Sequence, residues 1–155
     1  MSTRYRVTAT AHIDAPPDRL YGIIADYHTG HPSILPKPFR NLVIEQGGVG
    51  AGTIIRFEVH AYGTVTKCRA FVSEPEPGRV LVETNVEPTE SPTTFAVDPE
   101  ANGGSAVTIT TETQSRDGLA GVIERWMSTR FLKKLYAEEL ELLALRATGR
   151  RSKYL

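Results

Sequence analysis

Apolar and polar residues alternate over the first part of the chain. In RYRVTATAHI, residues 4–13, one face carries Tyr5, Val7, Ala9, Ala11 and Ile13, and the polar residues fall on the other face. A period of two over this length is typical of a strand with one buried face. The sequence therefore predicts a first strand over residues 4–13.

A short helix is predicted directly after this strand. In DAPPDRLYGIIADY, residues 14–27, the two prolines mark a helix start, and the apolar residues that follow recur at helical spacing. The next segment, HTGHPSILPKP (28–38), contains three prolines and one glycine. Because proline interrupts the hydrogen bonds of a helix, this segment is expected to form a turn or a second, brief helical piece.

Six further strands are predicted between residues 39 and 115, where short alternating segments follow one another. The turn signals that separate them include the glycine-rich stretch at 47–52, Gly63, EPEPG at 74–78 and the loop from Pro99 to Gly104. Connections this tight are typical of an antiparallel meander.

The apolar period changes from two to 3.6 in the last part of the chain. From Gly118 to Thr148 the apolar residues recur at spacings of three and four, with charged residues between them. This pattern predicts one long amphipathic helix that covers an open face of the sheet. We therefore expect one α+β domain over residues 1–148, followed by a flexible basic tail at 149–155.

Composition narrows the class of partner. The 155 residues include 18 basic and 18 acidic ones, and a net charge of zero argues against a nucleic-acid partner. The lone cysteine, Cys68, allows no intrachain disulfide and suits a reducing compartment, so a cytoplasmic protein is expected. No segment approaches the roughly 20 apolar residues of a membrane span, so stable membrane insertion is not expected.

The glycine-rich stretch EQGGVGAGT, residues 45–53, invites comparison with a phosphate-binding loop. Such a loop needs a helix N-terminus after it and a lysine that reaches the phosphates. Here Thr53 occupies the lysine position, and an alternating strand follows. We therefore predict a hairpin loop, and we expect its tip to gate a cavity mouth. The gate residues would be Gly47, Gly48, Gly50 and Gly52.

The order of elements resembles the START-like superfamily, and within it the polyketide cyclase/dehydrase and lipid transport family of SRPBCC proteins. The passage IDAPPDRLY at 13–21, the loop GGVGAGT at 47–53 and the long C-terminal helix carry the resemblance. It implies a helix-grip fold, in which a curved seven-stranded antiparallel sheet wraps around the helix and leaves a deep cavity. Family members bind lipids, plant hormones, aromatic polyketides or similar molecules there, and some cyclise or dehydrate what they bind.

The residues that line such a cavity are predicted from strand parity and helix spacing. On the strands they are Val7, Ala9, Ala11, Ile55, Phe57, Val59, Ala61, Val82, Thr84, Phe95, Ile109 and Thr111. On the helix they are Leu119, Val122, Ile123, Trp126, Met127 and Phe131. The small side chains of Ala9 and Ala11 leave space, which is filled either by a closer approach of the helix or by the cavity.

Acid–base chemistry has two candidates near the expected cavity mouth, Tyr27 and His31, because histidine titrates near neutrality and tyrosine can hydrogen-bond an enolate. Asp26, His28 and His31 lie close in sequence, but no further ligand at a recognised spacing completes a metal site, so no metal is predicted. No carboxylate pair is expected in an apolar setting that would raise a pKa. No cofactor is predicted.

These observations favour a protein that binds a small hydrophobic molecule, such as a lipid, an isoprenoid or a polycyclic aromatic. One alternative is a polyketide cyclase or dehydratase that uses a tyrosine or histidine of the cavity. A weaker alternative is a protein interaction module in which the long helix docks a partner. A monomer or weak homodimer is expected.

Overall fold

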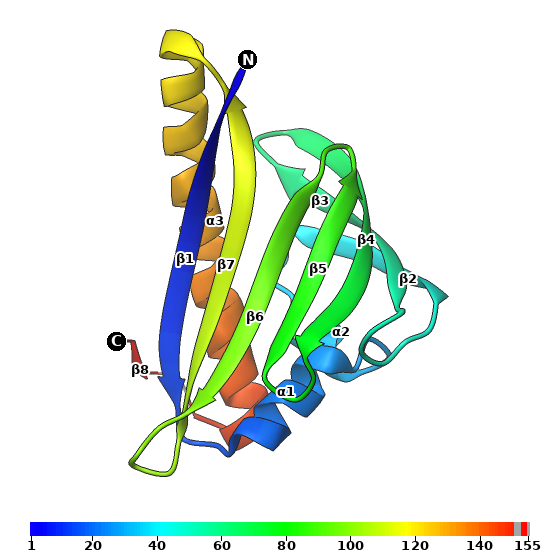
Figure 1. The fold of residues 1–155 in the computed structure, drawn as a ribbon, viewed down its shortest axis with the longest axis vertical. Helices are drawn as coiled ribbons and strands as arrows, with labels where there is room; N and C mark the ends of the chain where they lie inside the picture. The colour runs from blue at the N-terminus through cyan, green and yellow to red at the C-terminus, as the bar shows by residue number, and fades with distance from the viewer. Residues whose placement is uncertain (151–152, 155) are drawn as a thin grey trace.

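The computed structural model describes residues 1–150 and 153–154, which form one antiparallel sheet with three helices (Figure 1). The strands are β1 (Ser2–Ile13), β2 (Phe39–Gln46), β3 (Ile54–Ala61), β4 (Thr64–Glu76), β5 (Val80–Glu87), β6 (Ser91–Pro99), β7 (Ser105–Arg116) and β8 (Lys153–Tyr154). The helices are α1 (Pro17–Ala25), α2 (Gly30–Ile34) and α3 (Gly118–Thr148).

The strand order is β2-β3-β4-β5-β6-β7-β1-β8, so the meander closes when β1 pairs with β7. The predicted seven-stranded sheet, the two short helices and the long C-terminal helix are confirmed. Two-residue β8 extends the sheet beside β1 and lies within the predicted tail. Residues 151, 152 and 155 of that tail are outside the described residues.

The sheet curves around the second half of α3, which packs on β1 and β7 (Figure 1). α1 and α2 close one end of this arrangement, and both contact α3. Ala11 of β1 is fully buried in the same apolar cluster as Ala144 and Ala147 of α3. The small residues of the first strand therefore allow a close approach of the helix, which is the first of the two alternatives that the sequence left open.

The first half of α3 differs from the prediction. Its apolar stripe is exposed, with Leu119 at 79% and Trp126 at 60% of full accessibility. The helix starts directly after β7 and runs beside the far ends of β1 and β7 (Figure 1). The periodicity predicted the helix correctly, but apart from Gly121, which packs against Arg116 of β7, the helix residues become buried only from about Leu132 onward.

None of the described helices, α3 included, combines the length and the apolar composition that crossing a bilayer requires.

Candidate functional site

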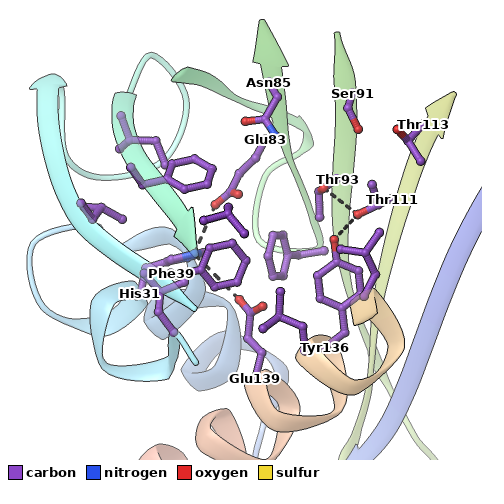
Figure 2. Close-up of a pocket in the computed structure, with 18 residues that line it drawn as sticks. His31, Phe39, Glu83, Asn85, Ser91, Thr93, Thr111, Thr113, Tyr136 and Glu139 are labelled. Carbon is purple, nitrogen blue, oxygen red and sulfur yellow. Dashed lines mark hydrogen bonds and ion pairs between the residues drawn. The ribbon is translucent and has the colours of Figure 1, made fainter. Parts of the chain in front are cut away.

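A cavity of about 170 Å³ lies between the curved sheet, α2 and the second half of α3 (Figure 2). One wall is apolar and is formed by Leu35, Phe39, Leu42, Ile55, Phe57, Val59, Phe95, Leu132 and Leu135. The other wall consists of polar side chains from three neighbouring strands, β5, β6 and β7: Glu83, Asn85, Ser91, Thr93, Thr111 and Thr113. His31, Tyr136 and Glu139 complete the lining. A mostly apolar pocket with a few placed polar groups is the usual form of a small-molecule site.

A larger groove of about 1110 Å³ runs along the outside of α3, where Lys37, Tyr62 and Phe131 are among its lining residues. It is more open to solvent than the cavity. Leu35 and Leu135 line both, so the groove lies directly outside the cavity wall. We take the cavity as the candidate site because the buried polar groups converge there.

His31 is the centre of a buried polar cluster at one end of the cavity. Its Nδ1 lies 2.7 Å from the carbonyl oxygen of Ile24, and because a carbonyl only accepts, Nδ1 carries a proton. Nε2 then faces the carboxyl oxygens of Glu83 at 3.2 Å and Glu139 at 4.0 Å. The ring stacks on Tyr27, with centroids 4.5 Å apart. The histidine is therefore fixed in one orientation with Nε2 toward two carboxyl groups.

The two carboxyl groups have different surroundings. Glu139 is buried on α3, and desolvation, followed by the nearby charge of Glu83, raises its pKa well above the ordinary value. Glu83 Oε1 accepts a hydrogen bond from the hydroxyl of Tyr27 at 2.5 Å and faces His31 as well. The cluster thus combines a carboxyl group of raised pKa, a second carboxyl group and an imidazole ring, an arrangement suited to acid–base chemistry.

A second hydrogen-bonded chain crosses the cavity wall from α3 to the sheet. Tyr136 contacts Thr111 through their hydroxyl groups, and Thr111 in turn lies 2.7 Å from Thr93 (Figure 2). Burial raises the pKa of Tyr136 to about 12. This tyrosine is therefore a neutral hydrogen-bonding group at neutral pH.

A family model described as polyketide cyclase / dehydrase and lipid transport matches residues 4–148. The chain belongs to this family. No curated relative matches the sequence.

Solved structures share the fold of this family member over nearly its whole length. The KanY protein superposes with a TM-score of 0.83 at 24% identity, covering 95% of this chain and 99% of that one. The Zhui aromatase/cyclase from Streptomyces sp. R1128 gives 0.73 at 17%, covering 95% and 94%. A START superfamily protein from Mycobacterium smegmatis gives 0.71 at 14%, covering 93% and 97%. At these identities the likeness establishes the fold, and the predicted helix-grip class is confirmed.

Part of the predicted lining surrounds the cavity described above. Five of the proposed strand residues line it, namely Ile55, Phe57, Val59, Phe95 and Thr111. The acid–base candidate His31 lines it too. The other candidate, Tyr27, is buried behind Glu83 and touches the site through that carboxylate. Burial and the charge of Glu83 raise the pKa of Tyr27 well above its usual range, so it acts as a donor that positions Glu83 and not as a base.

The remaining predicted residues lie elsewhere. Val7, Ala11 and Ile109 are buried, with Ala9 partly so, and none of these four lines the cavity. Ala61 and Phe131 line the outer groove. The exposed stripe of α3, defined as Leu119, Val122, Ile123, Trp126 and Met127, faces solvent. The helix residues that line the cavity lie one to three turns later and include Leu135 and Glu139.

On β5 the odd-numbered residues face the cavity, whereas the sequence predicted that the even-numbered Val82 and Thr84 would. Leu81 is fully buried, and Glu83 and Asn85 line the cavity, which places Val82 and Thr84 on the outer face. The prediction for this strand was wrong because it assumed that the β-branched residues lie on the inner face, as they usually do. Here the inner face carries the polar groups of the site.

The predicted glycine gate is held by backbone hydrogen bonds to the neighbouring elements. Tyr27 N–H donates to the Gly48 carbonyl at 2.8 Å, and Gly50 N–H donates to the Ala25 carbonyl at 2.9 Å. Gly48 has a φ of 142°, a backbone conformation that residues with a Cβ rarely adopt, so this position of the loop favours glycine. None of the four glycines lines the cavity.

Among the lining residues that sequence reasoning missed are both carboxyl groups of the cluster. Glu139 occupies a buried position of α3, in step with Leu135 and Leu143, and that spacing was the available signal. Glu83 alternates with Leu81 in the same way. The expectation that no carboxylate pair lies in an apolar setting was wrong, because these two meet only in the folded chain.

The acidic and histidine residues near α2 have separate roles. The Asp26 carboxylate accepts hydrogen bonds from the backbone N–H of His28 at 3.0 Å and from the Thr29 hydroxyl at 2.7 Å. The Thr29 hydroxyl bond is the largest cause that lowers the pKa of Asp26. Asp26 therefore organises the turn before α2, while His31 points into the cavity.

Proposed function

We propose that the protein binds one small, mostly apolar ring compound in this cavity, with the polar group of that compound at the cluster of His31, Glu83 and Glu139. The observation that carries the proposal is the enclosed space with an apolar wall and a single buried acid–base cluster. Apolar burial supplies most of the affinity, at about 25 cal/mol per Å² before the costs of association.

The cavity size narrows the ligand class further. A cavity of about 150 Å³ is known to accept benzene, whereas drug-sized ligands occupy about 300–1,000 Å³. At about 170 Å³ the site suits one or two rings. A long-chain lipid would need the outer groove as well, so we favour the aromatic or isoprenoid end of the predicted ligand classes.

Titration calorimetry with p-xylene and naphthalene tests binding directly. Val59→Trp places extra volume in the cavity wall and is expected to abolish binding of both probes. Val65→Trp is the matched control, because Val65 is 50% exposed on the next strand and lines no part of the cavity. Binding that survives Val59→Trp, or fails in the wild type for both probes, would contradict the proposal.

A second candidate function is catalysis of an aldol-type cyclisation and dehydration, and the protonated Glu139 beside His31 and Glu83 favours it. In that reaction a basic group of the cluster removes a proton from carbon, and the resulting carbanion attacks a ketone of the same chain. Glu139 gives its proton to the ketone oxygen, and loss of water completes the dehydration. Poly-β-ketone thioester turnover, lost in Glu139→Gln and in His31→Phe while p-xylene binding remains, would support catalysis. Unchanged turnover in both variants would exclude it.

A weaker candidate is an interaction module, and the exposed stripe of α3 is the observation that favours it. The occupant we propose is a second copy of the chain. Arg125 and Arg130 lie on the same half of the helix, and Lys133 and Lys134 follow directly after it, so repulsion between copies would keep the dimer weak and salt would strengthen it. Sedimentation velocity at low and high salt tests this. A monomer at both salts, or a dimer that Trp126→Glu leaves unchanged, would rule it out.

A further inference from the structure

Asn85 lines the cavity, and its side chain carries a buried hydrogen-bond acceptor that no protein group satisfies. Among the side chains of residues 1–150, its Oδ1 is the one buried nitrogen or oxygen atom without a hydrogen-bond partner. An unpaired buried polar group costs about 1–3 kcal/mol, and native proteins contain few of them. This position therefore calls for a partner from outside the protein.

The place of Asn85 in the cavity defines that partner. Figure 2 shows Asn85, Ser91 and Thr113 near one end of the site, with His31 and Glu139 at the other end. Asn85 pairs directly with Ser91 across β5 and β6, so their side chains lie about 5 Å apart on one face. The end with Asn85 and the end with His31 and Glu139 thus offer two polar positions in one cavity, and Glu83, two residues before Asn85 on the same face of β5, lies between them.

The hydroxyl groups of two neighbours at this end already have partners within the protein. The Ser91 hydroxyl donates to the carbonyl of Glu112 at 2.8 Å, and Thr93 and Thr111 bond each other. An amide oxygen only accepts, so the partner of Asn85 Oδ1 must be a donor. Asn85, Ser91 and Thr113 carry no charge, which favours a neutral donor.

We propose that the cavity binds a hydroxylated ring compound whose hydroxyl group donates a hydrogen bond to Asn85 Oδ1. This inference rests on the proposed function, because it assigns one further subsite in the same cavity. It makes Asn85 a specificity residue: an analogue with a methyl group in place of the hydroxyl leaves Oδ1 unpaired and binds less well. The acid–base cluster at the opposite end is free to receive a second polar group of the same molecule.

The test compares p-cresol with p-xylene, which differ by a hydroxyl against a methyl group of similar size. Dissociation constants for both are measured by calorimetry on wild type and on Asn85→Leu. The ratio of the constants for p-xylene and p-cresol is expected to fall about tenfold in the variant, the usual size of one buried hydrogen bond. Thr84→Leu, on the outer face of the same strand, is the matched control and should leave the ratio unchanged.

The outcomes separate the two proposals. If neither probe binds the wild type, the proposed function and this inference fall together. If both bind and Asn85→Leu leaves the ratio unchanged, this inference alone is overturned, and a water held by Asn85 is the remaining occupant. A ratio that changes with Glu83→Gln and not with Asn85→Leu overturns it as well. Asn85→Ala provides the same comparison should the leucine variant not fold, as judged by circular dichroism.

Discussion

The two halves of α3 have the same helical period of apolar residues and opposite environments. In the first half Leu119 and Trp126 are 79% and 60% exposed, whereas in the second half Leu140 and Leu143 are at most 2% exposed. The period is a local property of the sequence, but burial depends on whether another element lies opposite. In this protein the apolar residues of the second half are buried against the sheet, α1 and α2, whereas the first half contacts the end of β7 mainly through Gly121, Glu124 and Arg125. The candidate site lies at the second half.

The buried face of the second half is apolar except for one acidic residue, Glu139. Glu139 is 2% exposed between turns that carry Leu135 and Leu143. Burial of an ionisable group without full compensation is costly, and proteins concentrate such groups at functional sites. The second half therefore supplies both the buried core contacts and the site, whereas the apolar stripe of the first half faces solvent.

The largest expected difference between the halves is in stability. Leu140→Ala should lower the free energy of unfolding by about 2–5 kcal/mol, because it leaves a cavity in the core. Leu119→Ala removes the same atoms from the exposed half and should change stability by less than about 0.5 kcal/mol. Urea denaturation monitored by circular dichroism measures both. Equal losses would contradict the comparison.

The next effect is a pH dependence set by Glu139. Its pKa is raised in the folded protein, so the folded state holds a proton that the unfolded state releases above about pH 4.5. This contribution is fully present below that pH and is lost as the pH rises toward the folded value, at up to about 1.4 kcal/mol per pH unit. Glu139→Gln cannot ionise and should gain stability over wild type as the pH increases from 5 to 8.

Denaturation of Glu139→Gln and wild type at several pH values gives this difference. Glu138→Gln is the matched control, because Glu138 is the exposed neighbour on the same helix. A stability difference between wild type and Glu139→Gln that does not vary with pH would show that Glu139 is not held protonated.

A smaller effect is expected from the hydroxyl chain across the cavity wall. Tyr136→Phe removes the contact with Thr111 and should cost about 0.5–1.5 kcal/mol. A double-mutant cycle with Thr111→Val isolates the coupling between the two side chains. Costs that simply add in the double variant would mean that the two hydroxyl groups do not interact.

The smallest effect concerns Trp126 in the exposed half. Its ring is exposed and lies under the guanidinium of Arg130, 4.9 Å from the ring centroid. Emission typical of a solvent-exposed tryptophan is expected, with no change when p-xylene fills the cavity. A shift of the emission on binding would place Trp126 at the site, as the helix spacing predicted.

The sequence predicted the order of elements well because strand and helix periods are local. It predicted the site less well because inner faces are set by tertiary contacts. On β5 the β-branched Val82 and Thr84 point outward while Glu83 and Asn85 face the cavity, so the usual parity rule selected the wrong face. His31 was found because histidine near an expected cavity mouth is informative by itself. Its partner Glu139 lies more than 100 positions away along the chain, and only the fold shows that they meet.

Hydrogen–deuterium exchange with and without saturating p-cresol would locate the bound ligand along the chain. We expect slower exchange on binding in peptides from the second half of α3, near residues 132–143, and in β5 near 81–85. Peptides from 119–131 should exchange at the same rate in both states. Protection confined to 119–131, with none in the second half, would place the ligand on the exposed stripe and contradict the account.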